Sequence, residues 1–347
     1  MSMLVAVRRR LPHPLTLFAV LGVLAASLAL LLEWNPSFLA PGQYVFLPDT
    51  AHSLTPVVRV VGAKDAPGGG DLYWVDVFER RATWVDRINP PDGASFVDEA
   101  RLLTPGQSDA QLAQENAEDM QNSQHAAAYV ALRAAGYVTK ERALFVLDVS
   151  TQAPAGGRLF PADEIVTIDG KAPKTLLGLR RLIRARPAGT SHVFTVRRGI
   201  PQHTEKVTVP TVRGATGFPV VGILAGREPR LDIPPGLRIA IDAGSVGGPS
   251  AGLAFTLQLL QDLGRTVARG YKVAATGTIA LDGQVGAIGG IKQKTIGARN
   301  AHIDVFLVPV DGDNAKDAKP YAGGMRIIPV TTFQQALRAL ATLPRKG

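Results

Sequence analysis

Cysteine is absent from this sequence of 347 residues, which excludes disulfides, a thiol nucleophile and a cysteine-based zinc site. Histidine is scarce: the six histidines are scattered, and none lies in a His-Glu-x-x-His helix motif. A hydrolytic metal site is therefore not expected, and the sequence predicts neither a metal nor another cofactor. The lack of cysteine is compatible with a location outside the cytoplasm but does not require one.

Aromatic residues are few, at 6% of the chain, although the formal net charge is +9. The arginines and lysines are spread widely and form no basic–aromatic ladder, so nucleic acid is not a predicted partner. Hydrophobic residues make up 46% of the chain and charged residues 19%, which indicates buried cores rather than disorder. The length suits two or three domains.

Residues 11–32 contain no Asp, Glu, Lys or Arg and follow three consecutive arginines at 8–10. A helix of this length would span about 33 Å, close to the thickness of a bilayer's hydrocarbon core. We expect a cytoplasmic N-terminus (1–10), a single-pass transmembrane helix (11–32) in the cytoplasmic membrane, and an extracytoplasmic remainder. A cleaved signal peptide is the alternative, but the apolar run is long for one and cleavage after Ala40 would place Pro41 just beyond the bond.

The middle of the chain alternates between strand and helix patterns. Residues 33–112 predict a β-rich segment, and a capping-box spacing at 108–111 precedes a helix that runs to about residue 135. An apolar, β-branched run at 143–149 is followed by an alternating strand that ends in Asp-Gly at 169–170, and then by an amphipathic helix at 174–186.

This order, with Asp-x-Ile-x-x-Ile-Asp-Gly at 163–170, resembles a PDZ domain. The resemblance implies that residues 113–213 form a helix plus a PDZ-like β-rich domain that accepts an extended peptide as an added strand. The loop at 139–142 lacks the glycine that would turn amides toward a terminal carboxylate, so C-terminus binding does not follow. The residues predicted to line the peptide groove are Ala143, Leu144, Phe145 and Leu179.

The chemistry is concentrated in a glycine-rich turn. Ser250 follows Gly247-Gly248-Pro249 and begins an apolar helix pattern that reaches Leu263. The unpaired amides of a helix start could hold an oxyanion, with Gly248 and Ala251 as supporting neighbours of the serine. The alternative is an ordinary N-cap, which a serine in this position also suits.

A serine nucleophile needs a base, and the candidate is Lys294. A free lysine is protonated at neutral pH, so it must be desolvated before it can accept a proton. Residues 288–291 and 296–298 around it are small or apolar, which permits burial. A serine–lysine pair needs no histidine. A solvated helix lysine is the alternative.

The segment 237–343 carries Gly-Pro-Ser-Ala-Gly, Thr-Gly-x-Ile, Gly-Gly-Ile-Lys-x-Lys and Val-Phe-Leu-Val-Pro in order. These motifs are similar to those of the Lon protease proteolytic domain. The resemblance implies catalytic roles for Ser250 and Lys294, a supporting role for Thr276, protein or peptide substrates and a hexameric ring. The chain departs from the ATP-driven members at Gly247, where they commonly have an acid, and it has no Gly-x-x-x-x-Gly-Lys-Ser/Thr motif.

The predicted fold class is therefore α+β multidomain: a transmembrane helix, a PDZ-like β-rich domain and a Lon-type mixed α/β proteolytic domain at 214–347. Order and motifs together resemble the bacterial membrane-anchored, PDZ-containing, Lon-like serine proteases, which implies an ATP-independent endopeptidase whose PDZ-like module presents or gates the substrate. An inactive peptide-binding or scaffold protein is the alternative. A weaker one is an enzyme that takes an ATP-driven motor from a partner chain.

Overall fold

The computed structural model describes residues 14–34, 39–63 and 70–346, and it divides into two compact units. The first unit consists of residues 1–47 and 78–104, and the second of residues 48–77 and 105–347. Two strands, β1 (Leu39–Ser53) and β3 (Asp71–Thr83), each contribute residues to both units. The predicted division of the chain into five segments stays a prediction.

The first unit contains the helix α1 (Pro14–Trp34) and a small β-rich part. Residues 43–46 of β1 pair antiparallel with β4 (Ser95–Asp98), and Val45 and Ala82 are buried at its centre. The short helices α2 (Trp84–Ile88) and α3 (Glu99–Leu102) complete it. A capping box between Thr83 and Asp86 starts α2.

No helix within the described ranges is both long enough and apolar enough to cross a bilayer, which requires about 20 consecutive apolar residues. The prediction of a transmembrane helix over residues 11–32 is therefore wrong. The predicted single-pass localisation in the cytoplasmic membrane is wrong on the same finding, and the membrane as a partner is not shown. The helix that forms, α1, begins at Pro14, and the predicted cytoplasmic segment 1–10 lies outside the described residues.

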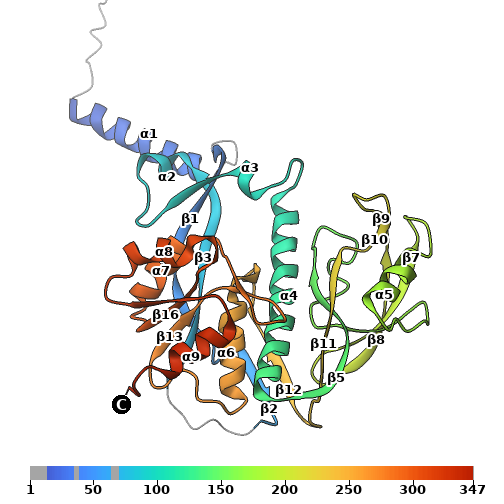
Figure 1. Ribbon diagram of the computed structural model, residues 1–347. Coiled ribbons are helices and arrows are strands. Elements are labelled where there is room, and N and C mark those ends of the chain that lie inside the picture. Colours follow the sequence, from blue (N-terminus) through green and yellow to red (C-terminus); the bar gives the residue numbers. More distant parts are fainter. Residues whose placement is uncertain (1–13, 35–38, 64–69, 347) are drawn as a thin grey trace, which may run out of the picture. The chain divides into compact units, whose positions relative to one another are not determined.

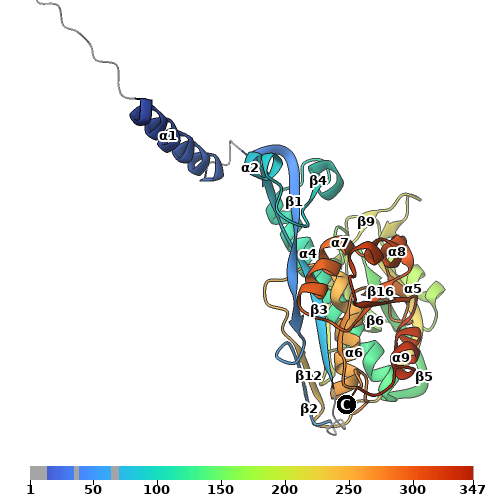
Figure 2. The same cartoon turned by 90° about the vertical axis from the view of Figure 1, so that its left-hand side faces the viewer.

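The second unit is built on a parallel sheet in the order β17-β16-β13-β3. Residues 273–275 of β13 and all of β16 are buried and apolar, as expected for strands of a sheet covered by helices on both faces. Figures 1 and 2 show helices beside this sheet. The new strands are β13 (Lys272–Ala275), β16 (Val305–Pro309) and β17 (Arg326–Val330), and the helices are α6 (Gly252–Asp262), α7 (Ile291–Asn300), α8 (Asn314–Ala318) and α9 (Phe333–Ala341).

A 27-residue helix, α4 (Asp109–Ala135), links this sheet to a β-rich module of the same unit. Ser108 and Gln111 form the predicted capping box at its start, and Gly136 in the left-handed conformation ends it. Buried residues of α4, including Tyr129 and Leu132, share one core with buried residues of α6. Two short strand pairs lie nearby: β2 (Val58–Val61) with β12 (Arg238–Ile241), and β14 (Thr278–Ile279) with β15 (Val285–Gly286).

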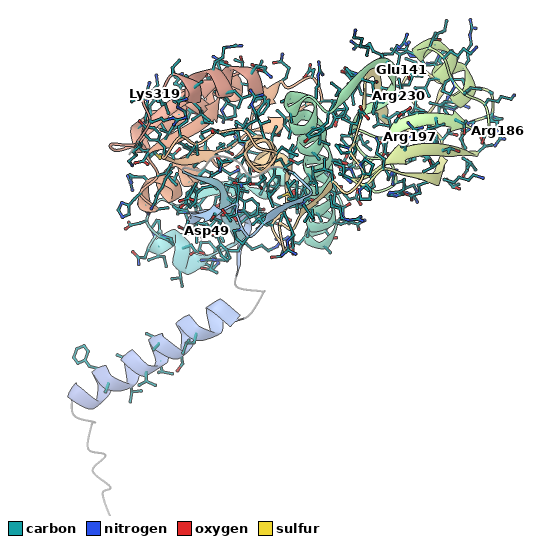
Figure 3. The ribbon with its side chains drawn as sticks, turned by 90° about the horizontal axis from the view of Figure 1, so that it is seen from below. Asp49, Glu141, Arg186, Arg197, Arg230 and Lys319 are labelled. Carbon is teal, nitrogen blue, oxygen red and sulfur yellow. The ribbon has the colours of Figure 1, made fainter. Side chains whose placement is uncertain are left out.

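The β-rich module is a five-stranded sheet in the order β11-β5-β6-β7-β8, with its own apolar core and the helix α5 (Leu176–Ile183). Arg230 contacts both Glu141 and the buried Glu164, and Arg197 also contacts Glu164, so charge pairs join β11, β5, β6 and β7. Figure 3 labels Glu141, Arg197 and Arg230 on this sheet. A small pair, β9 (Val212–Arg213) and β10 (Pro219–Val220), follows. The strands of the sheet are β5 (Val138–Val149), β6 (Glu164–Ile168), β7 (Ser191–Arg198), β8 (His203–Pro210) and β11 (Ile223–Leu231).

Candidate active site

The turn that carries Ser250 lies between β12 and α6. Gly248 has φ +84°, a conformation that favours glycine, and residues Pro249–Ala251 form a single 3-10 turn. The α-helix itself begins at Gly252, two residues later than the sequence suggests. Ser250 therefore does not act as the N-cap of α6, because that position belongs to Ala251. The serine hydroxyl is free for another partner.

That partner is Lys294 in the first turn of α7. Its Nζ donates a hydrogen bond to Ser250 Oγ with an N–O distance of 2.6 Å. Gly290, which precedes α7 with φ +68°, sets the start of the helix, and a Cβ there would lie 2.6 Å from Val77 Cγ2. The structure thus brings Ser250 and Lys294, which are 44 residues apart in sequence, into direct contact.

Burial gives Lys294 the electrostatics of a base. Only 4% of the residue is exposed, and desolvation lowers its pKa from 10.5 to about 8. The negative charge of Asp76 on β3 opposes that shift. Lys292, the other lysine of the motif, instead places its Nζ over the ring of Tyr321 at 5.7 Å. Of the two lysines of the motif, Lys294 is thus the one that contacts Ser250 Oγ.

Thr276 is fully buried and fixes the backbone of the serine. Its Oγ1 donates to Ser250 O at 3.2 Å, and the amide of Gly277 donates to the same oxygen at 2.8 Å. The Ser250 carbonyl is therefore held by two donors that follow β13. This restrains the turn without using the serine hydroxyl.

The helix α4 holds the other side of the turn, a role that the sequence did not reveal. Ser123 Oγ donates to Pro249 O at 3.1 Å, and the amide of Gly248 donates to Asn116 O at 2.6 Å. A Cβ at Gly247 would lie 2.7 Å from Asn116 Cβ, so glycine is needed for this approach. These partners are more than 120 residues apart in sequence, and nothing in the local pattern of α4 indicates them.

The supporting residues predicted beside the serine differ in what they offer. The amide of Gly248 is already bonded to Asn116, so it is not directed toward a substrate. Ala251 is buried and lies at the point where the 3-10 turn meets α6. The first amides of a helical turn have no partner inside that turn, so those of Ser250 and Ala251 are the candidates for holding an oxyanion.

A second group of titratable residues lies near the lysine. His52 Nε2 is 3.3 Å from Asp76 Oδ1 and 3.6 Å from Asp49 Oδ2. Burial raises the pKa of Asp76, and the charge of Asp49 adds to that effect, whereas His52 and Lys294 lower it. In the described part of the chain these three side chains form the one group with the composition and spacing of a metal site. The same three side chains also form a network of charged groups beside Lys294.

The predicted peptide groove has no open strand edge in this structure. Residues 142–149 of β5 pair antiparallel with β11, and Phe145 pairs with Glu164 of β6 on the other side. A peptide could be added beside β5 only if β11 were displaced. Of the four residues predicted to line the groove, Leu144, Phe145 and Leu179 are buried in cores, and Ala143 is half-buried.

Comparison with known proteins supports the assignment of the catalytic segment. Residues 236–342 match the family model of the Lon protease (S16) C-terminal proteolytic domain. The Lon protease of Chloroflexus aggregans is 38% identical over 115 residues, which cover 31% of this chain and 14% of that protein. Lon protease 1 of Myxococcus xanthus is 38% identical over 102 residues, which cover 28% of this chain and 12% of that protein. The chain thus spans only a small part of the length of these relatives.

Among solved structures, the PDZ domain of the SdrC-like protein from Listeria innocua is similar at 24% identity and a TM-score of 0.23. The match covers 25% of this chain and 96% of that one. The PDZ domain of the SdrC-like protein from Listeria monocytogenes matches at 23% identity with the same TM-score, covering 25% of this chain and 90% of that one.

Proposed function

We propose that this chain, whose residues 236–342 form a Lon-type (S16) proteolytic domain, is a serine endopeptidase that hydrolyses peptide bonds of protein substrates. The observation that carries the proposal is the 2.6 Å contact between Ser250 Oγ and the buried amine of Lys294. A hydroxyl and a desolvated amine at this distance are the two groups that serine–lysine hydrolysis requires.

The reaction follows from the protonation state of Lys294. The neutral amine takes the Ser250 hydroxyl proton as Oγ attacks the carbonyl carbon, and a tetrahedral intermediate forms. The amides of Ser250 and Ala251 stabilise its oxyanion. Protonated Lys294 then gives the proton to the leaving amine, and an acyl-enzyme remains. Water attacks the ester with Lys294 again as base, and the proton returns to Ser250 when the acid product leaves.

Thr276 and α4 act as positioning elements in this scheme. Thr276 holds the Ser250 carbonyl, and Ser123 holds that of Pro249, so the hydroxyl stays directed at the lysine. Activity independent of ATP, which the resemblance to the PDZ-containing, Lon-like proteases implies, belongs to this proposal. A ring of six chains, which the family resemblance implies, belongs to the same proposal and is checked by light scattering of the purified protein.

The β-rich module supports a role in presenting substrate. Leu147 and Asp148 of β5 and Leu224 of β11 line a pocket that also includes Pro249, the residue before the serine. The module therefore contributes surface directly beside the reacting groups. This is the basis for proposing that it guides the substrate chain rather than merely anchoring it.

The test is cleavage of an unfolded model protein by the full chain and by two variants, Ser250→Ala and Lys294→Ala. We expect Ser250→Ala to abolish cleavage and Lys294→Ala to reduce it by about 10²- to 10⁴-fold, because the general base is lost. Lys292→Ala is the matched control and should retain activity, since its amine lies over Tyr321. Cleavage by Ser250→Ala at the parent rate would refute the proposal, provided that circular dichroism shows both proteins folded.

A further inference from the structure

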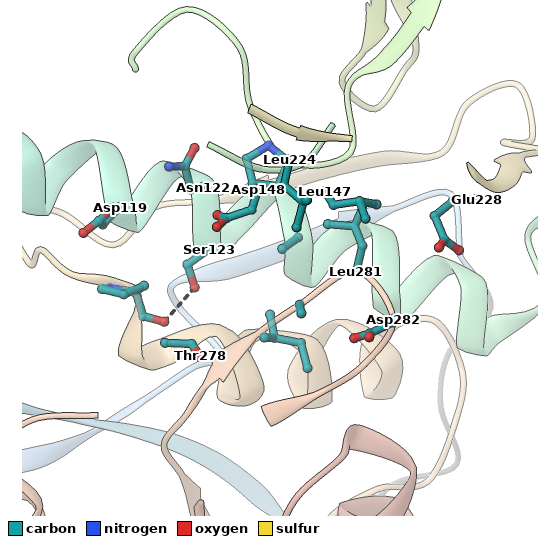
Figure 4. Close-up of a pocket in the computed structure, with 15 residues that line it drawn as sticks. Asp119, Asn122, Ser123, Leu147, Asp148, Leu224, Glu228, Thr278, Leu281 and Asp282 are labelled. Atoms are coloured by element: carbon teal, nitrogen blue, oxygen red, sulfur yellow. Dashed lines mark hydrogen bonds between the residues drawn. The ribbon is translucent and has the colours of Figure 1, made fainter. Parts of the chain in front are cut away.

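A pocket of about 490 Å³ lies beside the nucleophile turn. Its walls come from α4, from β5 and β11 of the β-rich module, and from the turn that follows β14, as Figure 4 shows. Pro249, which immediately precedes Ser250, is part of the wall. Because Ser123 lines the pocket and also bonds Pro249 O, the pocket and the nucleophile are held by the same helix. A side chain bound here belongs to a residue close to the bond being cleaved.

The lining combines apolar walls with negative charge. The apolar side chains that line it include Leu147, Leu224, Ile279 and Leu281, and the acidic ones are Asp119, Asp148, Glu228 and Asp282. Among the described residues that line the pocket, none is Lys, Arg or His. This lining would pack the aliphatic stem of a long side chain and attract a positive charge at its end.

Three of the four carboxylates have no ion pair with a cation of the protein among the described residues. Glu228 is paired with Arg133 at 3.1 Å, whereas Asp282 Oδ1 and Asp148 Oδ1 each accept one backbone amide, those of Gln284 and Val149. Asp119, in contrast, is half-buried and faces other acids: Asp148 on β5, and Glu115 and Glu118 on its own helix. Burial and then these charges raise the pKa of Asp119 to about 6. A bound cation would offset both the burial of the Asp119 carboxylate and its repulsion by the neighbouring acids.

We propose that this pocket binds a lysine or arginine side chain of the polypeptide substrate, with Asp119 and Asp148 as its ion-pair partners. This inference rests on the proposed peptidase function and adds a specificity to it. The occupant is a basic side chain because the pocket combines apolar walls with the carboxylates of Asp119 and Asp148, which have no ion pair among the described residues. Neither a neutral apolar side chain nor an acidic one satisfies both features. The residues that determine this preference come from α4 and the β-rich module, outside the segment that matches the Lon family model.

Binding tests the inference separately from cleavage. Full-length Ser250→Ala protein is titrated with fluorescent decapeptides that differ at one position, which is Lys, Arg, Gln or norleucine. We expect tighter binding of the Lys and Arg peptides by about two- to fivefold, the range for exposed ion pairs. Adding Asp119→Asn and Asp148→Asn should remove this preference and leave the affinity for the norleucine peptide unchanged.

A matched control adds Asp232→Asn and Asp317→Asn, which remove the same charge from exposed positions that do not line the pocket. It should keep the preference for basic peptides. Equal binding of Lys and norleucine peptides by the parent, or a preference that survives Asp119→Asn with Asp148→Asn, would overturn the inference. So would an equal loss in the control, which would show a general effect of net charge. Because this readout needs no hydrolysis, it decides the inference even if the proposed activity fails.

Discussion

At the scale of single residues, the proposed reaction depends on the protonation of Lys294. Its pKa is about 8, and only the neutral amine can accept the Ser250 proton. We therefore expect kcat/KM for a peptide without titratable side chains to rise about tenfold per pH unit below pH 8 and to level off above it. A profile that is flat between pH 6 and 9 would contradict the assignment of Lys294 as base.

A substitution of Asp76 is expected to shift the pH dependence of kcat/KM. Its negative charge favours protonated Lys294, so Asp76→Asn should lower the pKa of Lys294 further and shift the rising limb to lower pH. Asp71→Asn is the matched control, because it removes the same charge from the same strand at an exposed position. The measurement is the midpoint of the kcat/KM profile in the three proteins. A midpoint that stays at the parent value in Asp76→Asn, or moves equally in Asp71→Asn, would argue against this coupling.

At the scale of elements, local patterns predicted well what local forces determine. The capping box at Ser108 and Gln111 predicted the start of α4, and hydrophobic periodicity predicted its end near residue 135. The helix after the serine begins at Gly252 instead of Ser250, because Pro249–Ala251 adopt a 3-10 turn. What local pattern could not predict is that α4 packs against this turn, since that contact depends on residues far apart in the chain.

The contact between α4 and the turn gives a prediction about Gly247. A Cβ at this position would lie 2.7 Å from Asn116 Cβ, closer than real side chains approach. Gly247→Ala should displace the turn from α4, weaken the bond between the Gly248 amide and Asn116 O, and reduce kcat at least tenfold. Shortening the opposing side chain with Asn116→Gly should restore part of the lost activity in the double variant.

The Gly247 experiment needs a stability control, because glycine inside a helix itself costs about 1 kcal/mol. Urea unfolding of the single and double variants separates a lower population of folded protein from a misplaced serine. If Gly247→Ala retains full activity and stability, α4 does not restrain the turn through the close approach of Asn116 to Gly247.

At the scale of the whole molecule, the sequence predicted which two side chains meet better than it predicted what surrounds them. The Ser250–Lys294 contact was expected because the resemblance to the Lon proteolytic domain implies that these two residues act together. The strand pairing around the predicted peptide groove could not be predicted from the sequence in this way. The edge of β5 is covered by β11, and the pairing of Ala143 with Glu228 joins positions 85 residues apart that no periodicity connects. The acidic pocket escaped notice for the same reason, since α4 and two strands of the module contribute to it.

At the scale of the whole molecule, the proposed ATP-independent activity has a consequence for folded substrates. A peptidase that acts without ATP can cleave a folded protein only after that protein opens by itself. When opening and closing are fast relative to cleavage, the rate tracks the open population. A series of substrate variants with one cleavage sequence should be cleaved about tenfold faster for each 1.4 kcal/mol of lost stability.

The measurement is the initial cleavage rate of each substrate variant, plotted against its free energy of unfolding, with and without ATP and Mg²⁺. We expect the slope to be the same in both conditions, and a permanently unfolded variant to set the upper limit. Rates that are independent of substrate stability would mean that the enzyme unfolds its substrates actively. Rates of the most stable variants that rise only with ATP would point to a motor supplied by a partner chain, and the dyad would then be one part of a larger machine.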